Sequence, residues 1–394
     1  MNINRRYDMK TVTRTAIVVS VVSACVCCVP EPPLHLFDSG DIEIKLPLVE
    51  INLDTYWDYD FETTYTVDHN WRDEWFYGWD EEDERLFGPI GYTEPDVFLL
   101  RRYYTGSTPL VPHTSVLSAT VKGNSFRGRY NWGFWDLLVW NDIITPDGVQ
   151  SLIFDEQTSL DYVTAYTNQS MAFARYQAPR YTHAFYQPEE LFSAYAQGIE
   201  IDKNLTGFEY DPVNYVYVKH IGLLLEPITY IYLTQIILHH NNHRIVGVDG
   251  SGNLSGFGRT TVINTGITGD DAITVHYYNR LKYNCPRGDE LVDIVGGRLL
   301  TFGICGVNAN RIKKREEVTD NNSHYLDVTM QFNNGLDSTF VFDVTEQVRR
   351  RWKGGVITVE LDMDTVRIPS RTGGSAFDAV VKDFEDGGTH EFEM

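Results

Sequence analysis

The chain has 394 residues, of which 42% are hydrophobic and 13% aromatic, and its formal net charge is −22. The apolar fraction is sufficient for a large core, and at roughly 100–200 residues per domain this length predicts two domains. The negative charge argues against a nucleic-acid partner, because binding phosphates requires a basic surface. The 24 Tyr and 20 Phe residues favour a sheet-rich fold over a helical one.

The first residues have the pattern of a secretory signal. Basic residues precede an apolar, uncharged run, Thr15–Ala24, which has about half the length that a transmembrane helix needs. The run ends in Val22-Ser23-Ala24-Cys25, which resembles a bacterial lipobox. The resemblance implies cleavage after residue 24 and a diacylglycerol group on Cys25. We therefore expect a signal peptide over residues 1–24 and a lipidated, proline-rich tether over residues 25–40.

Three cysteines, Cys25, Cys27 and Cys28, lie within four positions, so a zinc site or a redox pair is an alternative to lipidation. A zinc site needs three or four ligands on a scaffold, and the chain has no second pair of closely spaced cysteines. A C-x-x-C redox pair is expected beside a βαβ unit rather than in a signal segment. Lipidation is the interpretation that we favour. No metal ion and no cofactor are predicted.

Alternating apolar and polar residues predict strands over most of the remaining chain. The alternation covers residues 42–48 and, after a one-residue shift beside Pro47, residues 49–53. Near the C-terminus, residues 326–332 and 340–344 flank Asn333-Asn334-Gly335, which predicts a hairpin. Residues 357–363 predict a further strand with one buried face.

Helical signals are few. Pro188 followed by Glu189 and Glu190 predicts a helix start within residues 187–196, and residues 343–355 predict one or two helical turns. The sequence therefore predicts an all-β protein of two tandem β-sandwich domains with a few short helices. The turn-rich residues 198–212 give the clearest boundary. We expect an N-terminal sandwich over residues 41–204 and a C-terminal sandwich over residues 205–394.

The segment Leu238–Arg244, LHHNNHR, contains the best candidate metal ligands. His239 and His243 would share one face of a helix, where both could bind a metal ion. The segment follows an alternating strand and contains Asn241-Asn242, which favours the polar tip of a hairpin.

Residues 249–256, DGSGNLSG, begin like a calcium loop, with oxygen-bearing side chains at Asp249, Ser251 and Asn253. The central glycine and the closing glutamate of such a loop are missing. A glycine-rich turn is therefore the simpler interpretation.

The segment Trp71–Glu84 combines aromatic residues with consecutive acidic residues. Trp71, Trp75, Tyr77 and Trp79 could form a glycan-binding platform, and this is our alternative hypothesis for function. The competing interpretation is that strand aromatics pack on the core beside a solvated acidic loop. No nucleophile elbow, phosphate-binding loop or dinucleotide fingerprint is present, so we expect a protein that is not an enzyme.

Cys285 and Cys305 lie in the second half of the chain and would be exported to an oxidising compartment. A disulfide between them is possible. The alternative is two buried free thiols, because Cys305 lies in an apolar run.

Four segments together resemble the fimbrillin-like outer-membrane lipoproteins of the Bacteroidales, and within them an uncharacterised domain family. They are ACVCC with HLFDSGDIEIKLPLVEINLD, YNWGFWDLLVWND, FYQPEELFSAY and LDVTMQFNNGLDSTFVFDVTEQVRRRWKGGVITVELDMDTV. The resemblance implies two transthyretin-like β-sandwiches, a lipid anchor in the outer membrane, exposure at the cell surface, and a role in a pilus or in adhesion. It also implies that pilus subunits are partners through β-strand addition.

The C-terminus departs from a pilus shaft subunit. Its last residues, DFEDGGTHEFEM, contain no alternating apolar strand to donate, and Phe377, Val380, Val381 and Phe384 have helical rather than strand spacing. This departure favours an anchor, a terminal subunit or a stand-alone surface lipoprotein.

Overall fold

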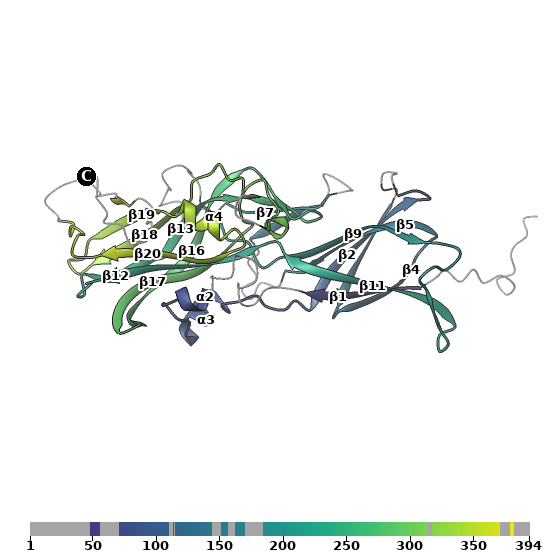
Figure 1. Cartoon of the computed structure of the whole chain (residues 1–394), viewed down its shortest axis with the longest axis horizontal. Coiled ribbons are helices and arrows are strands. Elements are labelled where there is room, and N and C mark those ends of the chain that lie inside the picture. Colours follow the sequence, from purple (N-terminus) through teal and green to yellow (C-terminus); the bar gives the residue numbers. More distant parts are fainter. Residues whose placement is uncertain are drawn as a thin grey trace, which may run out of the picture. The chain divides into compact units, whose positions relative to one another are not determined.

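Extended strands make up most of the described chain, and its helices are few and short (Figure 1). A computed structural model describes residues 48–55, 71–109, 113, 115–143, 151–156, 162–169, 184–313, 317–370 and 379–381. The helices in these ranges are α2 (Trp71–Glu74), α3 (Glu81–Phe87), α4 (Thr345–Arg350) and the 3-10 turn η1 (Ala309–Arg311). The expectation of an all-β fold with a few short helices is confirmed.

The first sandwich consists of two ladders that share one long strand. One ladder has the order β4-β1-β11 with β10 also paired to β11, and the other has the order β3-β2-β5-β9. The end of β11 leaves the first ladder and pairs with β9 through Glu226 and Pro227. The strands are β1 (Leu48–Thr55), β2 (Val97–Gly106), β3 (Ser115–Lys122), β4 (Ser125–Arg129), β5 (Gly133–Asn141), β9 (Phe192–Ile201), β10 (Glu209–Asp211) and β11 (Val216–Pro227).

The inward faces of these ladders form one apolar core. Val49 and Ile51 of β1 are fully buried and meet residues from β2, β5, β9 and β11. The predicted alternation over residues 49–53 is therefore confirmed for its two inward positions. The first half of that pattern, residues 42–47, lies outside the described residues. Core members include Leu100, Trp135, Leu137, Phe192 and Leu225.

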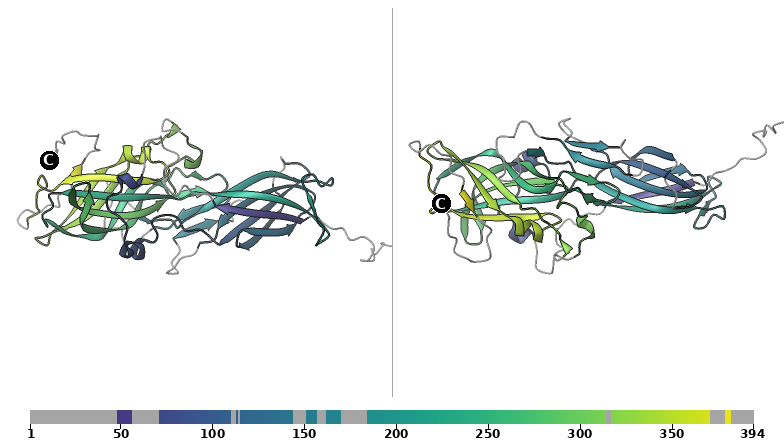
Figure 2. Two further views of the ribbon diagram at one scale, coloured as in Figure 1. Left: turned by 60° about the horizontal axis from the view of Figure 1, so that its bottom comes forward. Right: turned by 90° about the horizontal axis from the view of Figure 1, so that it is seen from above.

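The second sandwich is built in the same way. β16 belongs to both of its ladders, with the orders β20-β12-β17-β16 and β16-β13-β18-β19-β21, and β8 also pairs with β16. Figure 2 shows these strands from two further directions. The strands are β8 (Ala184–Tyr186), β12 (Tyr230–His239), β13 (Ile245–Gly258), β16 (Ala272–Arg287), β17 (Glu290–Thr301), β18 (Tyr325–Phe332), β19 (Asp337–Asp343), β20 (Gly355–Asp362) and β21 (Ala379–Val381).

Two strand predictions for this sandwich are confirmed. β18 and β19 pair antiparallel around the predicted turn, where Gly335 has a φ of 77° that favours glycine. The inward residues of β20 are buried as the alternation predicts, and they join a core that spans both ladders. A smaller sheet has the order β15-β14-β7-β6 and consists of β6 (Leu152–Asp155), β7 (Thr164–Thr167), β14 (Thr260–Val262) and β15 (Ile267–Thr268).

The helix predicted within residues 187–196 is wrong, because Phe192–Ile201 forms strand β9. The two glutamates expected in its first turn bind elsewhere. Glu189 Oε1 accepts from the Ser151 backbone N–H at 2.6 Å, and Glu190 Oε1 pairs with Arg298 Nη2 at 2.7 Å. Tertiary partners thus override a good local helix signal. The turns predicted over residues 343–355 are confirmed by α4. Val344, the residue before the helix, makes no side-chain cap, and the Thr345 backbone N–H donates instead to Asp343 Oδ1 at 3.0 Å.

The division into two domains, residues 41–204 and 205–394, stays a prediction. Strand pairing crosses it, because β10 and β11 follow residue 204 and complete the first sandwich. Residues Pro47–Met394 form one compact unit. In the described ranges, no helix has the length and apolar character that crossing a bilayer requires.

Candidate functional site

Strand β1 fills a position with a hydrogen-bonding neighbour on each side, which we call the β1 slot. It runs parallel to β11, from Leu48 opposite Val218 to Thr55 opposite Leu225. It runs antiparallel to β4, from Leu48 opposite Arg129 to Asn52 opposite Ser125. Figures 1 and 2 show β1 lying along β11. Both edges of this short strand therefore contribute backbone hydrogen bonds, and its inward side chains fill the core.

The solvent side of the β1 slot carries an ion pair. Glu50 Oε2 lies 2.6 Å from Arg127 Nη2 of β4, and 3.7 Å from His220 Nδ1 of β11. The arginine side chain is about half exposed, so this pair stabilises the strand only weakly, by less than about 1 kcal/mol. The two buried residues Val49 and Ile51 therefore dominate the energy that holds β1 in place.

The last described strand, β21, adds to the far edge of the second sandwich. Ala379–Val381 pairs parallel with Phe340–Phe342 of β19. The helical spacing expected around Val380 and Val381 is therefore corrected for these three residues, which are extended. Pairing with a buried neighbouring strand overrides the local pattern, as it does in β9.

The aromatic segment from Trp71 onward packs against the second sandwich. Tyr77 is buried, and a Cβ on Gly296 of β17 would lie 2.5 Å from its Cδ2, so this glycine makes room for the ring. Trp75 and Trp79 are half-buried and join the same small cluster with Ile237 and Ile294. Trp71 begins α2, and the structure does not describe its side chain.

Charged groups fix this segment in place. Asp83 is fully buried, forms an ion pair with Lys282, and lies 3.1 Å from Arg280 Nη1. The Tyr77 hydroxyl donates to Asp83 Oδ1 at 2.8 Å. Burial and this hydrogen bond raise the pKa of Tyr77 well above its usual value. Lys282 Nζ also lies 4.2 Å from the centre of the Tyr77 ring.

The expected strand aromatics and solvated acidic loop are therefore partly wrong, since Asp83 is buried and Trp75, Tyr77 and Trp79 lie between α2 and α3 rather than in a strand. The buried ring of Tyr77 is not accessible to a sugar, because Lys282 and Gly296 cover it. Glycan binding by Trp75 and Trp79 stays a prediction. The sequence did not reveal that this acidic segment pairs with basic residues about two hundred positions later.

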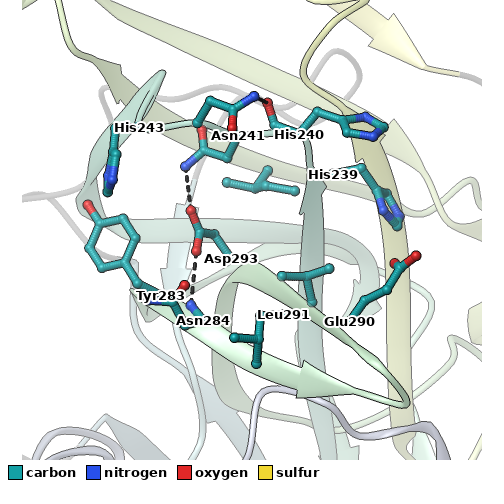
Figure 3. Close-up of a pocket in the computed structure, with 12 residues that line it drawn as sticks. His239, His240, Asn241, His243, Tyr283, Asn284, Glu290, Leu291 and Asp293 are labelled. Atoms are coloured by element: carbon teal, nitrogen blue, oxygen red, sulfur yellow. Dashed lines mark hydrogen bonds between the residues drawn. The ribbon is translucent and has the colours of Figure 1, made fainter.

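The histidine segment 238–244 connects the two ladders of the second sandwich. β12 pairs with β17 and β20, whereas β13 pairs with β16 and β18, so the expected hairpin is wrong, although the turn is polar. The segment lines a pocket of about 510 Å³ (Figure 3). His243 lies beside Tyr283 on one side of it, and His239 lies near Glu290 on the other. The two histidines are therefore not brought together as metal ligands.

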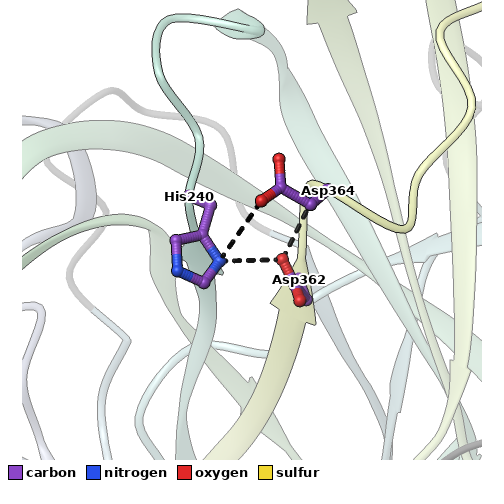
Figure 4. Close-up of side chains that lie close together, drawn as sticks. All are labelled: His240, Asp362 and Asp364. Atoms are coloured by element: carbon purple, nitrogen blue, oxygen red, sulfur yellow. Dashed lines mark hydrogen bonds and ion pairs between the residues drawn. The ribbon is translucent and has the colours of Figure 1, made fainter.

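A second group at this end of the sandwich contains His240, Asp362 and Asp364 (Figure 4). His240 Nδ1 lies 3.0 Å from Asp362 Oδ1 and 3.8 Å from Asp364 Oδ2, and all three side chains are exposed. The hydrogen bond to Asp362 raises the pKa of His240. Arg244 Nη1 lies 3.4 Å from Asp364 Oδ1, so both carboxylates already have basic partners within the chain.

The glycine-rich turn expected over residues 249–256 is wrong, because these residues belong to strand β13, in a ladder whose register shifts between Val248 and Gly252. Asn253 is buried, and its Nδ2 donates to Asp327 Oδ1 at 2.6 Å, whereas its Oδ1 lies 3.1 Å from His276 Nδ1. Burial raises the pKa of Asp327 to about 7 and lowers that of His276 to about 4. Asn253 is thus part of a buried polar network and not of a calcium-binding loop.

The cysteines lie in three different places. Cys25 is outside the described residues, so its lipidation stays a prediction. Cys285 and Cys305 are both free and buried, and they do not form the possible disulfide. Cys285 packs in the cluster beside Tyr77, whereas Cys305 Sγ lies 3.8 Å from the Gly256 carbonyl oxygen. In the part of the chain that the structure describes, Cys285 and Cys305 are therefore two buried free thiols.

No known protein family matches the chain, and no curated protein is similar to it. Among solved structures, a candidate adhesin from Bacteroides ovatus is 13% identical, with a TM-score of 0.47 over 83% of this chain and 94% of that one. The fimbrial anchor protein Mfa2 from Porphyromonas gingivalis is 10% identical, with a TM-score of 0.34 over 79% and 90%. The tip fimbrial protein Mfa3 of the same organism is 8% identical, with a TM-score of 0.31 over 86% and 96%. These scores and identities are low, so function has to be argued from this chain's own residues.

Proposed function

We propose that this chain is a non-enzymatic, lipid-anchored protein of the outer membrane that ends a pilus, as its anchor or another terminal subunit. In this proposal it accepts a strand from a neighbouring subunit in the β1 slot. The observation that carries the proposal is the pairing of β1 on both sides, with β11 and with β4. A strand placed there gains two rows of backbone hydrogen bonds, which is the basis of affinity in β-strand addition.

The inward side chains of β1 supply the specificity of such a site. Val49 and Ile51 alternate along the strand and are both fully buried, so withdrawing β1 would open two apolar positions. A donor strand with apolar residues at alternate positions would fill them.

The terminal role is supported at the other end of the chain. Strand β21 is already paired with β19 of the same chain. A strand that is already paired within its own chain is not available to a neighbour, which favours a subunit that accepts a strand over one that donates β21.

A reversible lock tests strand addition. Glu50 and Arg127 lie directly opposite each other on β1 and β4, so Glu50→Cys with Arg127→Cys can form a disulfide that holds β1 in the slot. The matched control, Val97→Cys with Lys122→Cys, joins β2 to β3 in the same sandwich. We expect the β1 lock, but not the control, to abolish co-purification with sheared fibres, and reduction to restore it. Equal co-purification by the locked and reduced forms would contradict the proposal.

The anchor has its own test. Cys25→Ser should leave a full-length precursor without lipid, measured by intact mass and by partitioning into detergent. A variant that is still processed to the normal mass and still partitions with membranes would refute lipidation at Cys25.

A further inference from the structure

Large apolar side chains are exposed together on the hairpin between β10 and β11. Four such residues lie within eight positions here: Tyr210 is 51% exposed, Val213 80%, Tyr215 67% and Tyr217 45%. We call residues 209–217 the tyrosine tip. Tyrosines exposed singly are ordinary, but a local group of them on a soluble surface marks a site of interaction.

The tyrosine tip is held in a fixed shape by its own hydrogen bonds. Asp211 Oδ1 accepts from the backbone N–H groups of Val213 and Asn214 at 2.9 and 3.2 Å, and its Oδ2 accepts from Asn214 Nδ2 at 2.7 Å. The rings of Tyr210 and Tyr217 lie 5.1 Å apart, centre to centre. The exposed side chains are therefore presented by an ordered turn, which reduces the entropy that binding would cost.

The tip lies at the end of the first sandwich where the chain enters it. Leu48, the first residue of β1, pairs with Val218, the residue that directly follows the tip. β1 and β11 are parallel, so both strands lead away from the tip, and β11 continues from Pro227 toward β12 of the second sandwich. The chain that leads from Cys25 in the proposed function enters the described fold at Leu48, beside the tyrosine tip.

We infer that the tyrosine tip is a membrane contact that seats in the headgroup layer of a phospholipid bilayer and orients the first sandwich on it. Tyrosine is suited to this layer because its ring is apolar and its hydroxyl stays hydrated. The charged residues within the tip, Glu209 and Asp211, are acidic, whereas the basic residues Lys219 and Arg129 lie beyond it, so the surface that fits is zwitterionic rather than anionic. The orientation of the first sandwich on the bilayer rests on the proposed lipid anchor at Cys25. The contact between the tip and the bilayer does not require that anchor.

The test uses a chain that begins at residue 26, which retains every residue that the structure describes and cannot be lipidated at Cys25. It is incubated with sedimentable vesicles of phosphatidylcholine and phosphatidylethanolamine, and the bound fraction is measured against lipid concentration. The tip variant carries Tyr210→Ser, Tyr215→Ser and Tyr217→Ser. The control variant carries Tyr162→Ser, Tyr278→Ser and Tyr283→Ser, which are 55%, 49% and 43% exposed and lie outside the tip.

We expect the unsubstituted chain to bind these vesicles and the tip variant to lose roughly tenfold or more in partitioning, with the control variant unchanged. Binding should weaken when phosphatidylglycerol replaces part of the neutral lipid. The inference is overturned if the unsubstituted chain does not sediment with vesicles, or if the tip variant binds as well as the control. Either failure leaves lipidation at Cys25 to be decided by the Cys25→Ser experiment, so the two proposals fail separately.

Discussion

Replacing the buried carboxyl of Asp327 with an amide should stabilise the protein at neutral and alkaline pH. Asp327 is 3% exposed in β18, and it accepts a hydrogen bond from Asn253, but no cation among the described residues lowers its pKa. Burial therefore raises its pKa from 3.8 to about 7. A group whose pKa is raised on folding contributes stability that is complete below the unfolded pKa and is lost as the pH rises through the folded pKa.

The size of the effect follows from the pKa shift. Three pKa units at about 1.4 kcal/mol each correspond to about 4 kcal/mol above pH 7. The amide oxygen introduced by Asp327→Asn can still accept from Asn253, so we expect this substitution to raise the free energy of unfolding by about 2–4 kcal/mol at pH 8. Urea unfolding at pH 5.5 and 8, followed by tryptophan fluorescence, measures this. Between these values the difference from the unsubstituted protein should grow by about 2 kcal/mol.

The matched control is Asp337→Asn, an exposed aspartate on the paired strand β19. Because its side chain is solvated, this substitution should leave the pH dependence of stability as it is in the unsubstituted protein. The reasoning is refuted if Asp327→Asn destabilises the protein at pH 8, or if its effect is the same at both pH values.

Three further predictions concern groups with defined partners. Asp83→Asn should lower the free energy of unfolding by about 2 kcal/mol, because Arg280 and Lys282 lose their buried counter-charge. It should also make the segment that carries α2 and α3 more sensitive to limited proteolysis. Cys285 and Cys305 should react with thiol reagents only after unfolding, since burial raises the pKa of both thiols, that of Cys305 to about 12; rapid labelling of the native protein would contradict this. In NMR titrations, His240 should have a pKa above 6.5 that falls in Asp362→Asn, and the stabilisation from this pair should be lost as the pH rises through that value.

Sequence patterns predicted the strands whose partners are close in the chain, or that have one apolar and one polar face. The hairpin of β18 and β19 has a glycine turn and clear alternation, and both are local properties. Strand β9 was missed because Glu189 and Glu190 resemble a helix start, whereas their carboxylates bind groups far away in the sequence. The turn-rich sequence near residue 204 suggested a domain boundary. It could not show that β11, which follows it, pairs with β1, since that contact joins segments about 170 residues apart.

The candidate site was predictable only in part. The resemblance implied strand addition, but it did not identify β1 as the strand with two paired edges. The exposure of Tyr210, Tyr215 and Tyr217 could not be predicted. Tyr215 and Tyr217 alternate with Val216 and Val218, and such a run of apolar residues is equally typical of a strand that is covered on both faces. The aromatic segment that begins at Trp71 was recognised, yet the covering of Tyr77 by Lys282 depends on a distant strand.

Immunogold electron microscopy on intact cells, with antibody raised to residues 205–394, tests the proposed role most directly. We expect gold at the surface, gathered at one end of each fibre. Label that reaches the protein only after the outer membrane is opened, or that spreads over a surface without regard to fibres, would contradict a pilus-terminal function.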